Sequence, residues 1–216
     1  MSRPLASKTA FVGAATQRGA LFGLDARLAV AILAALSVVV GYTGLQQLQQ
    51  AHYARVYTDL QALAKALGHL QRDLGAFPLH TSTGATPTER LAQLFSSAYV
   101  AADFSSHWRG PYLAVSESQL SSGYIYTYAL SGATLTYGLA DNPSCSTITN
   151  LDCTLDLQIT DAPLALAHFL NQQIDEAAGG YGGSSVTEAS PSTSGRLRWS
   201  GPDPVTITMQ TEVKRL

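Results

Sequence analysis

The chain has 216 residues, a length that allows one medium-sized domain and an anchoring segment. Its residues are 46% hydrophobic and only 13% charged, about half of the usual charged share of a globular protein. The net charge is −2, and the sequence has no basic stripe with interleaved aromatic residues. We therefore predict no nucleic acid among its partners.

The N-terminus is basic and is followed by an apolar run. Residues 1–24 contain three basic residues and no acidic one, and residues 28–40 contain only Ser37 as a polar residue. This order is typical of a cytoplasmic N-terminus followed by a segment that enters the membrane. We expect a cytoplasmic leader at residues 1–20. The apolar run is shorter than the roughly 20 residues of an isolated span, so it fits either a signal-peptide core or a helix supported by neighbours.

One long helix is predicted for the segment 21–74, with its regular part beginning near residue 24. No proline occurs between Pro4 and Pro78, and Gly75 then marks the end of the helix. Such a helix is roughly 75 Å long at 1.5 Å per residue. Its second half carries an apolar stripe at spacings of three and four, which also fits a core-facing helix or a coiled-coil stalk: Val56, Leu60, Leu63, Leu67, Leu70 and Leu74.

Residues 75–216 are predicted to form the exported globular domain. A short helix over TERLAQLFSSAYV is expected to start near Thr86 or Thr88, and two alternating runs broken at Ser131-Gly132 predict a β-hairpin. Further predicted elements are a strand at 154–160, a helix after Pro163, a loop at 179–195, and strands in RLRWS and PVTITMQTEV. A long helix followed by an antiparallel sheet with minor helices is an α+β fold.

Chemistry-bearing motifs are missing from the sequence. It contains no H-E-x-x-H, G-x-S-x-G, P-loop or G-x-G-x-x-G pattern, so we expect no enzyme and no cofactor. Asp141, Asn142 and Asp152 lack a calcium-ligand spacing. Cys145 and Cys153 have no histidine nearby, which makes a zinc site a poor alternative to a disulfide. A disulfide on the exported side would stabilise the domain by about 2.5 kcal/mol.

The junction QRGA-LFGLDARLAVAILAALSVVVGY resembles the class III signal of type IV prepilins and type II secretion pseudopilins. In that family, a basic leader ends before an apolar residue, and an acid stands fifth in the mature chain. Cleavage between Ala20 and Leu21 makes Asp25 the fifth residue, whereas the alternative between Gly19 and Ala20 makes it the sixth. The sequence departs from the family in having aspartate instead of glutamate and in the extra charge of Arg27.

Three further segments are similar to the family's globular part. Gly75-Ala76-Phe77-Pro78 looks like the turn that closes the helix, and Trp108-Arg109-Gly110-Pro111-Tyr112 resembles an aromatic Gly-Pro turn, with the glycine one place later. Asn171 to Glu176, followed by Gly195-Arg196, resembles an acidic helix end before a Gly-Arg strand. An insert at 177–194 separates these two parts.

The resemblance implies an inner-membrane single-pass subunit that a prepilin peptidase processes and methylates. Its helices then pack into a periplasmic or extracellular filament, as a homo-oligomer or with other pilins. Asp25 is implied to bind the terminal amine of a neighbouring subunit. A pilus, a secretion pseudopilus and a DNA-uptake fibre remain open, as do major and minor rank. The alternative is a single-span, membrane-anchored periplasmic binding or sensory domain that does not polymerise.

Overall fold

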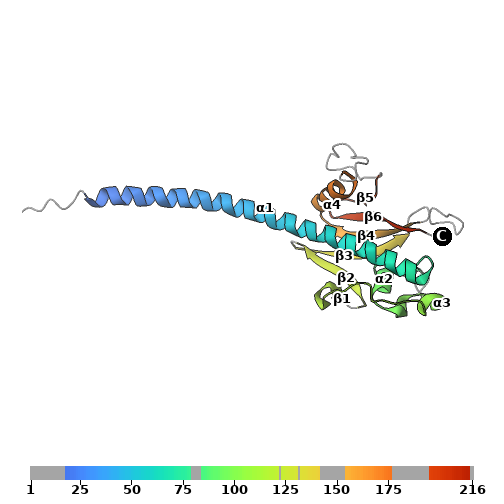
Figure 1. Cartoon of the computed structure of the whole chain (residues 1–216). Coiled ribbons are helices and arrows are strands. Elements are labelled where there is room, and N and C mark those ends of the chain that lie inside the picture. The colour runs from blue at the N-terminus through green and yellow to red at the C-terminus, as the bar shows by residue number, and fades with distance from the viewer. Residues whose placement is uncertain are drawn as a thin grey trace, which may run out of the picture. The chain divides into compact units, whose positions relative to one another are not determined.

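A computed structural model describes residues 18–78, 84–121, 123–130, 132–141, 154–176 and 195–214 (Figure 1). The predicted α+β fold is confirmed: a long N-terminal helix, α1 (Arg18–Leu74), accompanies an antiparallel sheet and minor helices. The chain divides into two compact units, Met1–Leu48 and Gln49–Leu216, and the division falls within α1.

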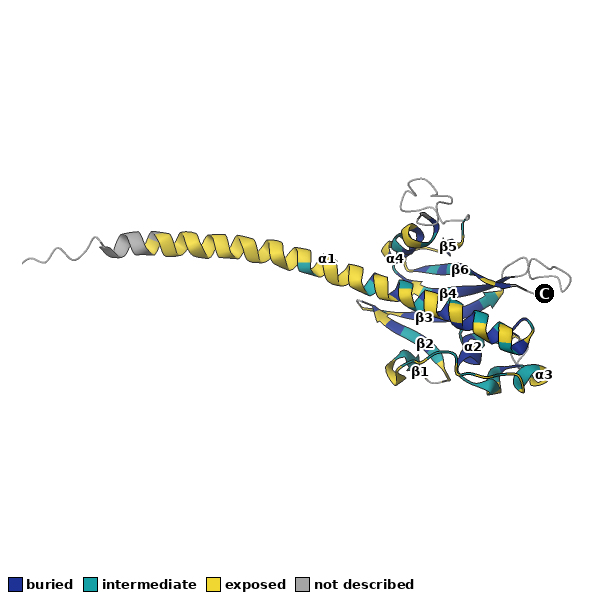
Figure 2. Ribbon diagram, in the orientation of Figure 1, coloured by how far each residue is buried: buried dark blue, intermediate teal, exposed yellow. Residues whose placement is uncertain are grey.

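The part of α1 in the first unit is mostly apolar and is exposed from residue 25 to residue 48, apart from the half-buried Gly44 (Figure 2). By length and composition, this one helix near the N-terminus suits a membrane crossing. Its hydroxyl groups bond within the helix: Ser37 Oγ donates to the Leu33 carbonyl at 2.8 Å, and Thr43 Oγ1 to the Val39 carbonyl at 3.1 Å. Each hydroxyl proton is thereby satisfied without water, as an apolar environment requires.

The second half of α1 belongs to the globular unit and forms one side of its core. All six residues of the predicted stripe are buried, against the apolar side chains of the sheet. The helix ends where expected. Gly75 adopts φ +65°, and its N–H donates to the Gln71 carbonyl at 3.0 Å, which satisfies an otherwise unpaired helix-terminal acceptor.

Six strands of the described residues form one sheet in the order β1-β2-β3-β4-β6-β5, with each neighbouring pair antiparallel. The predicted hairpin is confirmed, since Leu130 pairs with Ala133 across a turn that contains Gly132 at φ +92°. The C-terminal strand lies between β4 and β5. The strands are β1 (Leu120–Ser121), β2 (Ile125–Leu130), β3 (Ala133–Asp141), β4 (Thr154–Ala162), β5 (Leu197–Ser200) and β6 (Val205–Lys214).

The prediction of a continuous helix over TERLAQLFSSAYV is wrong beyond its first turn. Helix α2 (Pro87–Leu91) starts as expected, with a capping box between Thr86 and Glu89. It then gives way to two 3-10 turns, at 92–94 and 97–99. Ser96 separates these turns in an extended conformation, and its Oγ accepts from the Ala98 N–H at 3.3 Å, a local bond that competes with helix continuation.

Two more short α-helices lie in the described part, α3 (Ala102–Ser105) and α4 (Leu164–Asn171), and a further 3-10 turn lies at 117–119. The helix predicted after Pro163 is therefore confirmed, and Leu166 and Leu170 of its apolar face are fully buried. A π-helical turn at 172–176 extends α4. It brings Ile174 of the same predicted face against the core.

Candidate functional site

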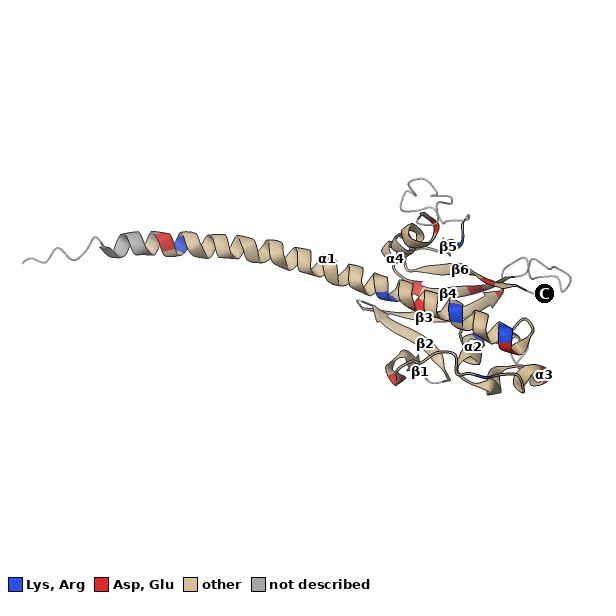
Figure 3. Ribbon diagram, viewed as in Figure 1, with Lys and Arg blue, Asp and Glu red and all other residues tan. Residues whose placement is uncertain are grey.

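Two opposite charges open the described apolar half of α1. The side chains of Asp25 and Arg27 are exposed, and no Asp, Glu, Lys or Arg then follows until Arg55 (Figure 3). Within the described residues, the one salt bridge joins Arg90 to Asp141 at 2.8 Å. Asp25 and Arg27 therefore stand at the entrance of an apolar helix without an ionic partner from the described part of their own chain.

The other predicted processing and disulfide residues are described less fully. Gly19, Ala20 and Leu21 lie in the first turn of α1, so the predicted cleavage bond lies in helical backbone. Cys145 and Cys153 lie outside the described residues, as does most of the predicted loop at 179–195. The disulfide therefore stays a prediction.

The aromatic Gly-Pro turn ties the end of α1 to the following loop. The Tyr112 hydroxyl donates to Asp73 Oδ2 of α1 at 2.8 Å, and Trp108 Nε1 donates to the Gln93 carbonyl at 2.8 Å. The Trp108 and Tyr112 rings meet edge to face, with centroids 5.7 Å apart. A Cβ on Gly110 would lie 2.7 Å from both rings, which explains glycine there. These contacts give the segment a packing role, as its aromatic composition predicts.

The two parts of the third resembling segment meet in space although 18 residues, 177–194, separate them in sequence. Asp175 is buried in the π-helical turn, and its carboxylate accepts from the N–H groups of Arg196 at 3.0 Å and Leu197 at 3.2 Å. Gly195 stands at φ +92°, and a Cβ there would overlap the same carboxylate. The acid thus anchors the start of β5 with charge-assisted hydrogen bonds.

A polar cluster that the sequence did not reveal lies between α1 and the sheet. Asp59 receives a hydrogen bond from the Tyr126 hydroxyl, yet its Oδ2 is buried without a partner among the described residues. Burial raises the pKa of Asp59, and nearby Arg55 opposes this rise only in part. The Tyr137 hydroxyl is also buried and unpartnered, and burial together with Asp59 raises its pKa. The sequence does not predict this burial, because Asp59 lies off the apolar stripe of the helix, where a solvated residue is expected.

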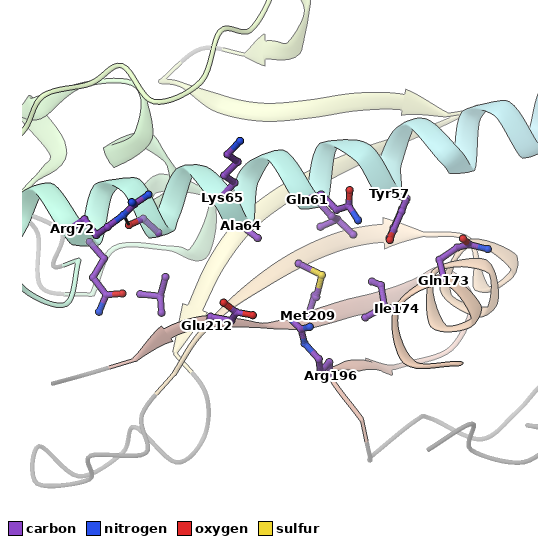
Figure 4. Close-up of a pocket in the computed structure, with 14 residues that line it drawn as sticks. Tyr57, Gln61, Ala64, Lys65, Arg72, Gln173, Ile174, Arg196, Met209 and Glu212 are labelled. Atoms are coloured by element: carbon purple, nitrogen blue, oxygen red, sulfur yellow. Dashed lines mark hydrogen bonds between the residues drawn. The ribbon is translucent and has the colours of Figure 1, made fainter. Parts of the chain in front are cut away.

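A groove of about 740 Å³ runs along α1 beside β6 and the π-helical turn (Figure 4). Met209 and Ile174 project into it toward α1, whereas the Lys65 side chain extends away from β6. Arg196 and Glu212 supply exposed charges of opposite sign. No group of three or more His, Cys, Asp or Glu residues in the described ranges is placed to bind a metal ion. The groove offers an apolar floor with charged edges.

Comparisons with protein-family models, curated proteins and solved structures find no match to this chain. The described molecule combines an exposed apolar helix segment that begins with an unpaired acid and base with a well-packed α+β unit. The first feature suits contacts with lipid or with other apolar helices.

Proposed function

We propose that this chain is a structural subunit of a type IV pilus-like or type II secretion filament, a pilin or pseudopilin. Its leader is removed between Ala20 and Leu21, or between Gly19 and Ala20, and the exposed part of α1 then packs against the same part of other subunits. The observation that carries the proposal is the contrast within α1. Residues 28–48 carry no charge and are mostly apolar yet almost wholly exposed, while the stripe from Val56 to Leu74 is buried.

The exposed part of α1 forms a continuous apolar surface and not a few scattered apolar residues. Eleven large apolar residues between Leu28 and Leu48 are more than half exposed. Monomeric soluble proteins rarely expose continuous apolar surface of this kind, which marks a membrane or protein contact. The Asp25–Arg27 entrance favours a protein contact after membrane insertion, because a charge in an apolar setting is stabilised by a partner of opposite sign.

A second candidate function is a membrane-anchored binding domain that stays monomeric. The groove between α1 and β6 favours it, since concave sites with an apolar floor and a few polar groups are typical of ligand binding. The groove is open, and no cluster of titratable residues converges on it within the described ranges. We therefore rank the anchored domain below the filament subunit.

Processing and assembly test the proposal together. We would express the full chain with a prepilin peptidase and a filament assembly system, and record the intact mass of the membrane protein with and without the peptidase. We expect loss of residues 1–20, or 1–19, only when the peptidase is present. The processed chain should also appear in the sheared filament fraction.

An unprocessed N-terminus in both samples, or a cut beyond Tyr42, would contradict the filament proposal. A processed chain that never leaves the membrane fraction would favour the anchored domain. In that case, blocking the groove by Ala64→Trp should abolish ligand-induced thermal stabilisation, which a filament subunit does not require.

A further inference from the structure

We propose that Arg27 of one copy forms an ion pair with Asp25 of a neighbouring copy, and that this contact repeats in one direction from copy to copy. The inference rests on the proposed filament and adds a second partner for Asp25, because a carboxylate can accept bonds from a guanidinium and from a terminal amine together. The occupant of the exposed α1 surface is then a second copy of the same chain.

The positions of the two residues exclude pairing within one helix. Two residues apart on an α-helix are separated by about 200° around the axis and about 3 Å along it. Asp25 and Arg27 therefore point to nearly opposite sides of α1, and both are exposed. Their ionic partners must come from outside the helix that carries them.

The placement of Asp25 and Arg27 on opposite sides of α1 also determines the symmetry of the contact between copies. A two-fold pair would need both residues of each copy at one shared interface. Because the acid and the base of α1 face different sides, one copy can offer Asp25 to one neighbour and Arg27 to another. Such a heterologous contact extends from copy to copy and does not stop at a dimer.

The chemistry of the pair suits an apolar helix bundle. Helix axes pack about 8–10 Å apart, a distance that a long arginine and a short aspartate can bridge together. Arginine keeps its charge in apolar surroundings and binds carboxylates with two parallel N–H bonds. A single arginine extending to the lipid headgroups would not depend on Asp25, which gives a rival explanation that can be tested.

The first test removes or retains the positive charge at residue 27. We expect Arg27→Gln to lower recovery in the sheared filament fraction by about tenfold or more, because it removes one of the two cationic partners of the neighbour's carboxylate in the bundle. Arg27→Lys retains the charge but cannot form the two parallel N–H bonds, so its recovery should lie between those of Arg27→Gln and wild type. Membrane insertion and leader removal serve as controls and should not change, since Arg3, Lys8 and Arg18 remain.

The second test measures geometry and leaves both charges in place. Ala29 and Ala31 stand one turn after Asp25 and Arg27 and are exposed. The test uses a chain with Cys145→Ser and Cys153→Ser, so that no native thiol can react. In assembled filaments treated with a short bismaleimide, the double variant Ala29→Cys with Ala31→Cys should give a ladder of dimers, trimers and longer species. Each single variant should stay monomeric, because a heterologous contact sets residue 29 of one copy against residue 31 of the next.

Three results would overturn the proposal. Arg27→Gln filaments at wild-type yield would show that the pair does not stabilise assembly. Dimers from either single variant would show a two-fold contact. Monomers alone from the double variant, in filaments that do form, would show that the two faces do not meet. Failure of the wild-type chain to form filaments would instead refute the proposed function.

Discussion

The two halves of α1 share one 57-residue helix and differ in what their side chains contact. From Val56 to Leu74, every stripe residue is buried against the sheet of the same chain, whereas Leu36 in the first half is 57% exposed. Both halves are rich in leucine, so composition does not separate them. The charged residues do: the second half intersperses Arg55, Asp59 and others, and the first half has none after Arg27.

This difference shows how a helix encodes two kinds of partner. A helix with a narrow apolar stripe buries that stripe against one domain, and a helix that is apolar all round needs an apolar surrounding on every side. Each half also carries a carboxylate. Asp59 is half-buried and accepts a hydrogen bond from a tyrosine of its own chain, while Asp25 has no ionic partner among the described residues.

The largest effect is expected from Asp25→Ala. In a filament core this change leaves a neighbour's cationic group unpaired, at about 3–5 kcal/mol per contact and again at every subunit. The variant should insert and be processed normally but be missing from sheared filaments. Asp25→Glu should retain assembly. Equal recovery of Asp25→Ala and wild type would identify Asp25 as a membrane-boundary charge and favour the anchored domain.

Two leucine truncations, one in each half of α1, should affect different properties: folding stability in the second half and filament assembly in the first. Leu67→Ala removes a fully buried side chain and should lower the free energy of unfolding by about 2–5 kcal/mol. Leu36→Ala should change it by less than about 0.5 kcal/mol, since Leu36 contacts no core. Urea unfolding of the full chain in detergent, followed by tryptophan fluorescence, measures both. Filament recovery should fall for Leu36→Ala. A similar loss of stability for both variants would contradict the comparison.

The disulfide prediction tests the proposed export of the second unit. Cys145 and Cys153 should be linked in protein isolated under oxidising conditions, and non-reducing peptide mapping should recover the two peptides as one species. Reduction should then lower the free energy of unfolding by about 2.5 kcal/mol. Free thiols would count against the bond and against export of this unit.

Local sequence patterns predicted most of the fold. Apolar spacing located the buried face of α1, and the Gly75 and Gly132 signals placed a helix end and a hairpin turn. Such signals work because they depend on a few neighbouring residues. Alternating runs likewise predicted β4, β5 and β6 as strands.

Long-range features could not be predicted in the same way. The position of β6 between β4 and β5, and the bonds from Asp175 to the start of β5, join residues far apart in sequence. The burial of Asp59 depends on tyrosines that β2 and β3 place opposite α1. Helical periodicity alone assigns Asp59 to solvent. The periodicity identifies which face of the helix is apolar, but it does not tell how far the sheet extends around the helix.

The smallest predicted effect concerns that buried carboxylate. Burial raises the pKa of Asp59 above its ordinary value of 3.8, so the charged form is less favourable in the folded than in the unfolded state. At neutral pH this lowers stability, and Asp59→Asn should raise the free energy of unfolding by about 1 kcal/mol. The wild-type chain regains that difference as the pH falls through the raised pKa, because the folded state then takes up a proton more readily than the unfolded state.

The stability difference between Asp59→Asn and wild type should therefore be full at pH 7 and approach zero below pH 3.8, the ordinary value. Tyr137→Phe provides the control, because it removes the other unpartnered polar group of the cluster without removing a carboxylate. Its effect should be near zero or stabilising and should vary little between pH 7 and pH 4, since a tyrosine hydroxyl stays protonated across that range. Urea unfolding at a series of pH values measures both variants. A loss of stability in Asp59→Asn at pH 7 would mean that the carboxylate stabilises the second half of α1, and Asp59 would then resemble Asp25 in depending on a partner.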